Sequence, residues 1–531
     1  MSLLVSCLDS KVRPLAVWCR LGILLSLTGL VGCVAGPDFR RPEPPAVGNY
    51  TASPLPVQTV SAPGMLGGAQ HFLAQAPIRP AWWQQFGSHR LNYLIGSSGF
   101  RGGSALYPHG TPKSHLIGHA LQSNPTLAAA RATLRVAEQT YAAQAGATLF
   151  PQANGQLGVQ RQRITPAVQD QTGPERTFTL YNANIGVSYN LDLSGENRRT
   201  LEALAAQTDF QRFQLEGARL TLAANIVTTA ITQAQLAEQI RADKQILAAE
   251  KEQLGLTRRR LALGNASEID VVSIQTQVEQ TRAGIVPLRN RLEQTGHLLA
   301  ILVGEPPAAA AIPQFTLTDF TLPTDLPVQV PSELVRRRPD IQASEALLPV
   351  ASAQYGVAVS RLYPQLTLTG NVGSQALTSA ALFGPGSLVW GLAGQLAQPL
   401  FNAGLRPAAR AARAEFDTAA ANYRQTVLLA LRNVADVLRA LDNDAQILQA
   451  QTAADASAQQ ALDLVQQQYR LGAASYLQLL IAQQQAQQTR IGLIAAQAQR
   501  LMDTAALYQA MGGGTSGTGG SGTPEQIGAV H

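Results

Sequence analysis

The sequence contains little cysteine, few aromatic residues and little charge, and each shortage excludes a class of protein. Three cysteines among 531 residues are too few for a disulfide framework. Charged residues make up 14% of the chain and aromatic residues 5%. Although the net charge is +6, no run of Lys and Arg is interleaved with aromatic residues, so nucleic acid is not an expected partner. After the amino terminus, no stretch of about 18 uninterrupted apolar residues would form a membrane-spanning helix.

The sequence also lacks the motifs of common catalytic and cofactor sites. Its seven histidines are scattered. There is no His-Glu-x-x-His zinc motif, no glycine-rich phosphate loop ending in Lys and no nucleophile elbow. No pair of carboxylates is singled out by its spacing. We therefore expect no enzyme activity, no metal and no cofactor other than a covalent lipid.

The amino terminus has the pattern of a secretion signal. Lys11, Arg13 and Arg20 precede an apolar run from Leu21 to Gly32, which is too short to cross a bilayer as a helix. We therefore predict that residues 1–32 form a cleaved signal peptide.

The signal ends in Leu30-Val31-Gly32-Cys33, which resembles the lipobox of bacterial lipoproteins. The resemblance implies that Cys33 becomes the first residue of the mature chain and carries lipid, palmitate included. Val34, rather than Asp, at the next position is similar to lipoproteins sorted to the outer membrane. The alternative is an ordinary cleaved signal with an incidental cysteine.

A strand that leads directly into a very long helix dominates the first half of the chain. From Phe178 to Leu193 apolar and polar residues alternate, which is typical of a barrel strand crossing a bilayer. A turn at Asp192–Gly195 follows, and no proline occurs from Glu196 to Leu263. A helix of that length measures roughly 100 Å. Apolar residues every seven positions predict a coiled-coil seam along it, at Ile240, Leu247, Leu254 and Leu261.

The flanking elements complete a unit that occurs twice. In the first copy we predict a helix from Asn124-Pro125 to Leu149, a strand near Ala153–Arg163 and, after the long helix, a helix capped by Ser267 that ends at Val303. The second copy repeats this order. Its predicted elements are a helix from Pro339 to Pro364, strands around Leu366–Val372 and Leu388–Leu400, a long helix from Leu405 to Leu471 with a seam at Val427, Val434, Leu441 and Leu448, and a helix capped by Ser475. Gly404 occupies the place of Gly195 before the second long helix.

These elements divide the chain into six segments. They are the signal peptide 1–32, a lipidated N-terminal tether and equatorial segment 33–115, the first repeat 116–307, a linker 308–331, the second repeat 332–511 and a disordered glycine-rich tail 512–531. Within the second segment, residues 34–80 suit an extended tether because they are rich in Pro, Ala and Gly.

One chain supplies four membrane strands, which cannot close a barrel with a usable lumen. An open sheet edge in lipid would leave backbone groups unpaired, at several kcal/mol each. The chain must therefore share a barrel with copies of itself. We predict a mainly α protein with membrane β structure, in which three copies form a 12-strand β-barrel continuous with a periplasmic α-helical barrel.

Three sequence motifs carry a resemblance to a known family. They are Cys33–Pro42, the pair Pro331-Ser332-Glu333-Leu334 and Arg337–Asp340, and Gln398-Pro399-Leu400-Phe401 with Gly404. They resemble the lipoprotein branch of the TolC-like outer membrane factors. The segment Ser97–Ser114 looks inserted relative to that family.

The resemblance implies a homotrimeric, passive exit duct for small molecules in the outer membrane of a Gram-negative bacterium. The implied partners are a periplasmic adaptor, an inner-membrane transporter and outer membrane lipid. Alternatives are a type I secretion duct for polypeptides and a periplasmic adaptor or coiled-coil scaffold lipoprotein. Strand aromatics such as Tyr189 and Trp390 are expected to face lipid.

The two helical tips are the candidate functional sites. Gly264, Ser267, Ile269 and Asp270 correspond to Gly472, Ser475, Leu477 and Gln478 at a constant offset of 208. The resemblance implies that the turns at Gly264, Ser267, Gly472 and Ser475 contact the adaptor. The alternative reading is a plain tight turn at each tip.

Three residues near the tips are gate candidates. Asp270 completes a helix cap with Ser267, and its place in the family implies a hydrogen bond to Tyr469 of the other hairpin when the pore is closed. Capping alone and capping combined with gating both remain open. Gln478 replaces an acid that the family often carries, which predicts weaker cation preference at the tip.

Overall fold

The computed structural model describes residues 35–43, 46–96, 120–164 and 176–514. The predicted signal peptide, Cys33, the inserted segment 97–114 and the tail from residue 515 lie outside the described residues.

The chain separates into two units. The strand unit is made of Met1–Pro42, Leu134–Phe210 and Ser344–Tyr423. The hairpin unit is made of Glu43–Thr133, Gln211–Ala343 and Arg424–His531.

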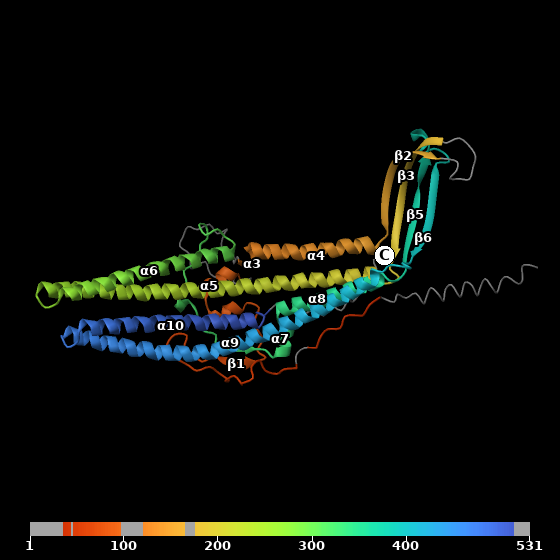
Figure 1. Cartoon of the computed structure of the whole chain (residues 1–531). Coiled ribbons are helices and arrows are strands. Elements are labelled where there is room, and N and C mark those ends of the chain that lie inside the picture. Colours follow the sequence, from red (N-terminus) through yellow and green to blue (C-terminus); the bar gives the residue numbers. More distant parts are fainter. Residues whose placement is uncertain (1–34, 44–45, 97–119, 165–175, 515–531) are drawn as a thin grey trace, which may run out of the picture. The chain divides into compact units, whose positions relative to one another are not determined.

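The strand unit contains an antiparallel sheet of four strands in the order β2-β3-β5-β6. The strands are β2 (Gln152–Ile164), β3 (Arg176–Leu191), β5 (Gln365–Ala376) and β6 (Leu388–Ala397) (Figure 1). All four predicted strands are confirmed. The prediction that the last one reaches Leu400 is wrong, because Pro399 has no N–H to continue a ladder.

Two long helices follow the two strand pairs, as predicted. Helix α5 (Glu196–Ala262) has 67 residues and α9 (Leu405–Arg470) has 66. Their returning partners are α6 (Glu268–Val303) and α10 (Tyr476–Ala510). None of the helices in the described ranges is both long enough and apolar enough to span a membrane.

The helices that open each repeat are also confirmed. They are α4 (Pro125–Leu149) and α8 (Pro339–Ser360). The Asn124 side chain accepts hydrogen bonds from the backbone N–H groups of Thr126 at 2.9 Å and Leu127 at 3.2 Å, so it is the predicted cap. The remaining helical elements are η1 (Trp82–Phe86), α2 (His89–Ile95), α3 (Ala120–Ser123), η4 (Leu317–Asp319), α7 (Pro331–Arg337) and η5 (Ser379–Ala381).

The seam of the second long helix forms the core of the hairpin unit. Val434 and Leu441 are fully buried, and they pack with Leu326, Leu334 and Leu507. In the first long helix Ile240 and Leu254 are buried, whereas Leu261 near the tip is 36% exposed. The predicted seam is therefore confirmed at Val434 and Leu441 in the second long helix and at Ile240 and Leu254 in the first, whereas the prediction is wrong at Leu261 near the tip.

The prediction that residues 34–80 form an extended tether is wrong for residues 70–74. Strand β1 (His71–Ala74) pairs in parallel with β4 (Asp325–Val328). The Gln70 side chain is fully buried and donates to the Pro323 carbonyl oxygen at 2.9 Å. The composition predicted an extended chain here. Instead, pairing with β4 and the buried hydrogen bonds of Gln70 to Pro323 and to Thr504 of α10 fix residues 70–74 within the hairpin unit.

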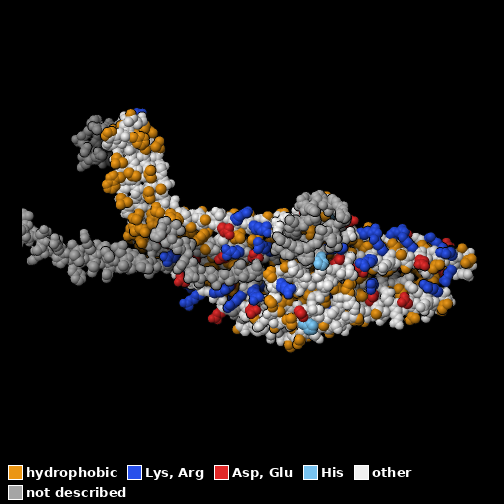
Figure 2. Space-filling model, turned by 180° about the vertical axis from the view of Figure 1, so that it is seen from behind, with side chains coloured by type: hydrophobic (Ala, Val, Ile, Leu, Met, Phe, Trp, Pro, Cys, Tyr) orange, Lys and Arg blue, Asp and Glu red, His pale blue; other side chains and the backbone are white. Residues whose placement is uncertain are grey.

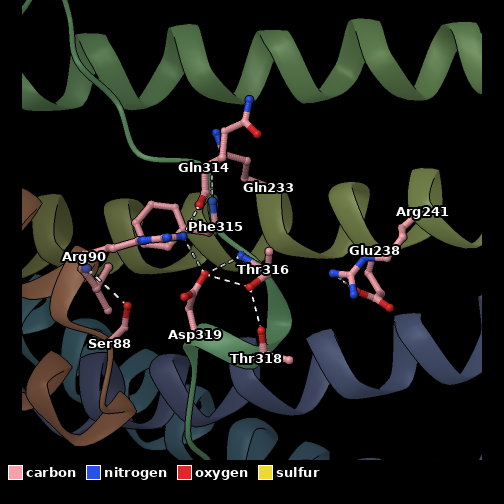
Figure 3. Close-up of polar contacts among 11 residues, drawn as sticks. Ser88, Arg90, Gln233, Glu238, Arg241, Gln314, Phe315, Thr316, Thr318 and Asp319 are labelled. Carbon is pink, nitrogen blue, oxygen red and sulfur yellow. Dashed lines mark hydrogen bonds and ion pairs between the residues drawn. The ribbon is translucent and has the colours of Figure 1, made fainter. Parts of the chain in front are cut away.

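The linker between the repeats also contacts helices α2 and α5 of the hairpin unit (Figure 3). The Phe315 N–H donates to Gln233 Oε1 of α5 at 3.0 Å. Arg90 donates to the Gln314 carbonyl oxygen at 2.6 Å and to Asp319 Oδ2 at 3.1 Å. The linker is thus a fixed part of the hairpin unit.

The prediction of a disordered tail is wrong for its first three residues. Gly512, Gly513 and Gly514 all have positive φ and follow α10 in packed surroundings. A Cβ on Gly513 would lie 2.1 Å from Leu220 Cδ1, so only glycine fits this approach.

Candidate functional site

The four-stranded sheet has one apolar and one polar face. The register aligns Ile185 with Val372 and Val372 with Trp390, so these three side chains share a face. By the same alternation the apolar face carries Leu157, Val159, Ile185, Val187, Tyr189, Leu191, Leu366, Leu368, Val372, Leu388, Trp390, Leu392 and Leu396. Figure 2 shows hydrophobic side chains gathered over these strands.

The opposite face is built mostly from amides and hydroxyls, with Phe178, Leu180 and Val389 among them. It carries Asn154, Gln156, Asn182, Asn184, Ser188, Asn190, Thr367, Thr369, Asn371, Gln375 and Gln395. On the apolar face Trp390 is 76% and Leu392 81% exposed. An exposed apolar face opposite a polar one is the pattern of a membrane barrel wall around an aqueous lumen. Tyr189 and Trp390 lie on the apolar face, as predicted.

The two edges of this sheet are open in a single chain. Among the described residues, β2 pairs only with β3, and β6 pairs only with β5. The backbone groups on the outer sides of β2 and β6 therefore need partners, because lipid offers none.

The junction between β3 and α5 is held by carboxylates. Asp192 accepts hydrogen bonds from the N–H groups of Asn197 at 3.1 Å and Arg198 at 2.9 Å, which satisfies two of the free donors of the first helical turn. Glu196 accepts from Arg361 at 3.0 Å and from Gln365 at 2.8 Å. The long helix is thus fixed to the start of the second strand pair.

The two strand-to-helix turns match in position but not in conformation. Gly195 has φ +81°, which favours glycine. Gly404 lacks a positive φ, and its N–H instead bonds to Asn402 Oδ1 at 3.0 Å. The predicted equivalence is therefore limited to chain position, because an Asn side chain shapes the second turn.

The two tips are built alike. Gly264 has φ +75° and Gly472 φ +76°. Ser267 and Asp270 form a complete capping box, with bonds of 3.2 Å and 3.1 Å. Ser475 and Gln478 form the same box, with bonds of 3.3 Å and 2.8 Å. The amide of Gln478 therefore replaces the carboxylate of Asp270 without changing the cap.

Exposed apolar side chains flank both tips. Leu263 and Ile269 are each 76% exposed in the first turn. Leu471 is 85% and Leu477 63% exposed in the second. Leu263 and Leu471 were missed by the sequence analysis, although the same offset of 208 relates them. Large exposed apolar residues at matching turns mark a surface suited to a partner.

The gate candidates contact different partners within one chain. Tyr469 packs edge-to-face on Tyr476 at 6.4 Å, and the Arg260 guanidinium lies 5.4 Å from the Tyr469 ring centroid. Arg260 also donates to the Arg470 carbonyl oxygen at 3.4 Å. Arg260 was missed because nothing in the sequence distinguishes it from the adjacent arginines.

Asp270 and Tyr469 are not hydrogen-bonded to each other among the described residues. The Asp270 carboxylate is engaged in its own cap. The bond between Asp270 and Tyr469 stays a prediction for the assembled protein.

The ring next to Tyr469 has a shifted pKa. Burial is the largest cause that raises the pKa of Tyr476 to about 12, and Glu250, Tyr469 and Asp270 raise it further.

The chain matches the sequence model of one protein family and several known proteins. The family is described as "Outer membrane efflux protein", and its model matches residues 116–305 and 330–513. The chain is 30% identical over 496 residues to the "Probable efflux pump outer membrane protein TtgC" of Pseudomonas putida, covering 92% of this chain and 95% of that protein. It is 31% identical over 446 residues to the "Pyoverdine export outer membrane protein OpmQ" of the same organism, covering 83% and 89%.

Solved structures agree with these sequence relatives. The structure described as the outer-membrane channel OprN is 25% identical, with a TM-score of 0.78, and the match covers 91% of this chain and 99% of that one. A membrane protein from Pseudomonas aeruginosa is 26% identical, with a TM-score of 0.77 and coverage of 91% and 98%. Together with the two-faced sheet and the duplicated helical hairpins, these matches show that the chain belongs to the outer membrane efflux protein family and is the outer membrane channel of a Gram-negative efflux pump.

Proposed function

We propose that three copies of the chain assemble into a passive exit duct of a tripartite pump. The observation that carries this proposal is the sheet with one apolar face, one polar face and two open edges. Each chain supplies one sheet of four strands, so three sheets joined edge to edge give twelve strands. Twelve strands are enough for a water-filled lumen. The long helices would continue the wall on the periplasmic side.

The cargo is proposed to be small molecules. Relatives of similar identity are named for different cargoes, toluene for TtgC at 30% and pyoverdine for OpmQ at 31%. In the described strands, the face proposed to line the lumen carries mostly amides and hydroxyls, which are not specific for one of these cargoes. The inner-membrane transporter is therefore proposed to select the substrate.

The helical tips are proposed to bind a periplasmic adaptor. Leu263, Ile269, Leu471 and Leu477 are exposed there at matching positions. Replacing Leu263 and Leu471 together with Ser should weaken adaptor binding by about tenfold or more, since two buried leucine contacts would be lost. Val136→Ser, at a residue 65% exposed on α4, is a control that should bind the adaptor normally.

Cys33 is proposed to carry the lipid that anchors the mature chain in the outer membrane. The support is the lipobox-like sequence that ends at Cys33. Mass spectrometry of the amino-terminal peptide tests this directly, and an unmodified cysteine would contradict it.

Planar bilayer recording tests the duct itself. The purified mature protein should insert as a trimer and conduct ions, and uncharged polymers should block the current above a size set by the lumen. Cells without the channel should regain efflux of a small toxic compound when the chain is supplied. A protein that inserts but conducts nothing under any condition would overturn the proposal.

A further inference from the structure

The charged residues of the four-stranded sheet are all arginines, and they lie at one end of it. The four strands contain Arg161, Arg163 and Arg176 and no Asp, Glu or Lys. Arg161 and Arg163 are near the end of β2, and Arg176 begins β3. This end of the strand pair is the one away from α5, which follows the other end of β3. These strands therefore carry only positive charge, at the rim that faces the exterior.

Two of these arginines continue the apolar face of the sheet. Alternate residues of a strand share a face, so Arg161 and Arg163 follow Val159 on that face of β2. The register places Arg161 opposite Thr179 and Arg163 opposite Thr177. Both arginines are exposed. The face that carries the hydrophobic side chains thus ends in guanidinium and hydroxyl groups.

The apolar belt that ends at these groups has the height of a membrane. Its outer row is Tyr181 with Val159, and its periplasmic row is Leu191 with Leu366. Ten residue steps separate Tyr181 from Leu191, which is about 34 Å along a strand. With strands tilted by about 45°, the belt is about 24 Å tall, close to the roughly 25 Å of outer-membrane barrels. Arg161 is the next residue of this face, at the boundary between hydrocarbon and the outer headgroups.

Arg161 has no acidic partner in the described part of the chain. Its side chain makes no ion pair or hydrogen bond with the described residues, whereas Arg163 has a partner within the chain. A neighbouring copy that pairs its β6 with β2 supplies no carboxylate from that strand either, because β6 has no acidic residue. The guanidinium of Arg161 is therefore available to an external anion.

The anion that this boundary offers is the phosphate of a lipid headgroup. An arginine at the edge of hydrocarbon keeps its charge, and its stem lies along apolar surface while its head reaches the polar layer. The planar guanidinium binds phosphate oxygens through two parallel N–H groups. A threonine hydroxyl on the adjacent strand is a further donor.

We propose that Arg161 and Thr179 bind the phosphate group of a lipid in the outer leaflet. Arg163 adds positive charge at the same rim. The acyl chains of that lipid lie along the apolar belt beneath the two residues. This inference rests on the proposed barrel, in which the apolar face meets lipid.

Lipid binding to the purified mature channel in detergent tests the site. Native mass spectrometry measures the retention of phosphatidic acid, which has an exposed phosphate, and of diacylglycerol, which lacks it. Arg161→Gln should weaken the binding of phosphatidic acid by about tenfold, because it removes hydrogen bonds between charged groups. It should leave the binding of diacylglycerol unchanged. Arg161→Lys keeps the charge without the two parallel donors and should weaken the binding by a smaller factor.

Two control variants and a competitor define the site further. Arg289→Gln removes the same charge from an exposed position on α6 of the hairpin unit and should bind phosphatidic acid as the wild type does. Gln160→Ala changes the neighbouring residue on the polar face of β2 and should also bind as the wild type. Inorganic phosphate at the same concentration as the lipid should not displace it, because it lacks acyl chains for the belt.

Equal binding of phosphatidic acid by the wild type and Arg161→Gln would overturn the site. An equal loss in Arg289→Gln would overturn it too, since the charge would then act regardless of its place. Displacement by an equal concentration of inorganic phosphate would overturn the assignment to a lipid. Conductance of the same samples separates this inference from the duct. A conducting channel without preference for phosphatidic acid loses only the lipid site, whereas a wild type that never conducts contradicts the proposed function.

Discussion

At the residue scale, Arg260 and Tyr469 join the ends of the two long helices. The guanidinium of Arg260 lies over the Tyr469 ring. The hydroxyl of Tyr469 is the group that is predicted to bond to Asp270 in a closed pore. Tyr469→Phe keeps the ring for Arg260 and removes only the hydroxyl. It therefore separates the gating role of the hydroxyl from the packing role of the ring.

We predict that Tyr469→Phe raises single-channel conductance in planar bilayers if the hydroxyl holds the pore closed. Arg260→Gln should raise it further, because it removes both the cation–π contact and the bond to the Arg470 carbonyl oxygen. Arg259→Gln, at an exposed neighbour, is the control. Conductance unchanged in Tyr469→Phe would mean that Asp270 acts only as a cap.

A buried carboxyl makes the stability of the hairpin unit depend on pH. Burial raises the pKa of Asp444 to about 8, hydrogen bonding and repulsion from Asp503 add to the shift, and Arg500 opposes it. The folded protein then binds this proton more tightly than the unfolded chain does. Stability is full near pH 4 and falls as the pH rises through about 8.

We predict that melting of the helices in detergent shifts to lower temperature from about pH 5 to about pH 8.5, with a slope of at most about 1.4 kcal/mol per pH unit for one proton. Asp444→Asn should remove most of this fall. Asp436→Asn, at a side chain 71% exposed on the same helix, should behave as the wild type. An equal fall in Asp444→Asn would assign the effect to another group.

At the scale of the element, the sheet and the tips were predictable because their signals are local. Alternation from Phe178 placed β3, and the pattern of Ser, Asp and Gln after each glycine placed both capping boxes. The packing of Gln70 was not predictable, because its partners Pro323 and Thr504 are remote in the chain. The contact between Arg199 of α5 and Asp38 is remote in the same way.

The two faces of the sheet should respond differently to the same charge. Leu392→Lys places an ammonium on the apolar face, where a lysine at mid-membrane costs about 2–4 kcal/mol. We predict a lower folded fraction in vesicles, measured by resistance to protease. Gln395→Lys adds the same charge to the polar face of the same strand and should insert normally. Equal loss in both variants would contradict the assignment of the faces.

At the scale of the whole molecule, the open edges of β2 and β6 make association necessary. We predict that native mass spectrometry of the mature protein in detergent gives three chains and no stable single chain, because each edge needs a partner in lipid. A single chain that remains folded in vesicles would contradict the shared barrel.

The sequence by itself determined the order of the elements, the duplication, the helix caps and the need for several copies. These depend on periodicity, turn chemistry and the count of strands, all of which act over short stretches. Only the tertiary structure decided which remote side chains meet. It brought Arg199 to Asp38, Arg260 to Tyr469 and the first residues of the tail against Leu220. Such contacts depend on how separate elements pack, and no local pattern encodes that packing.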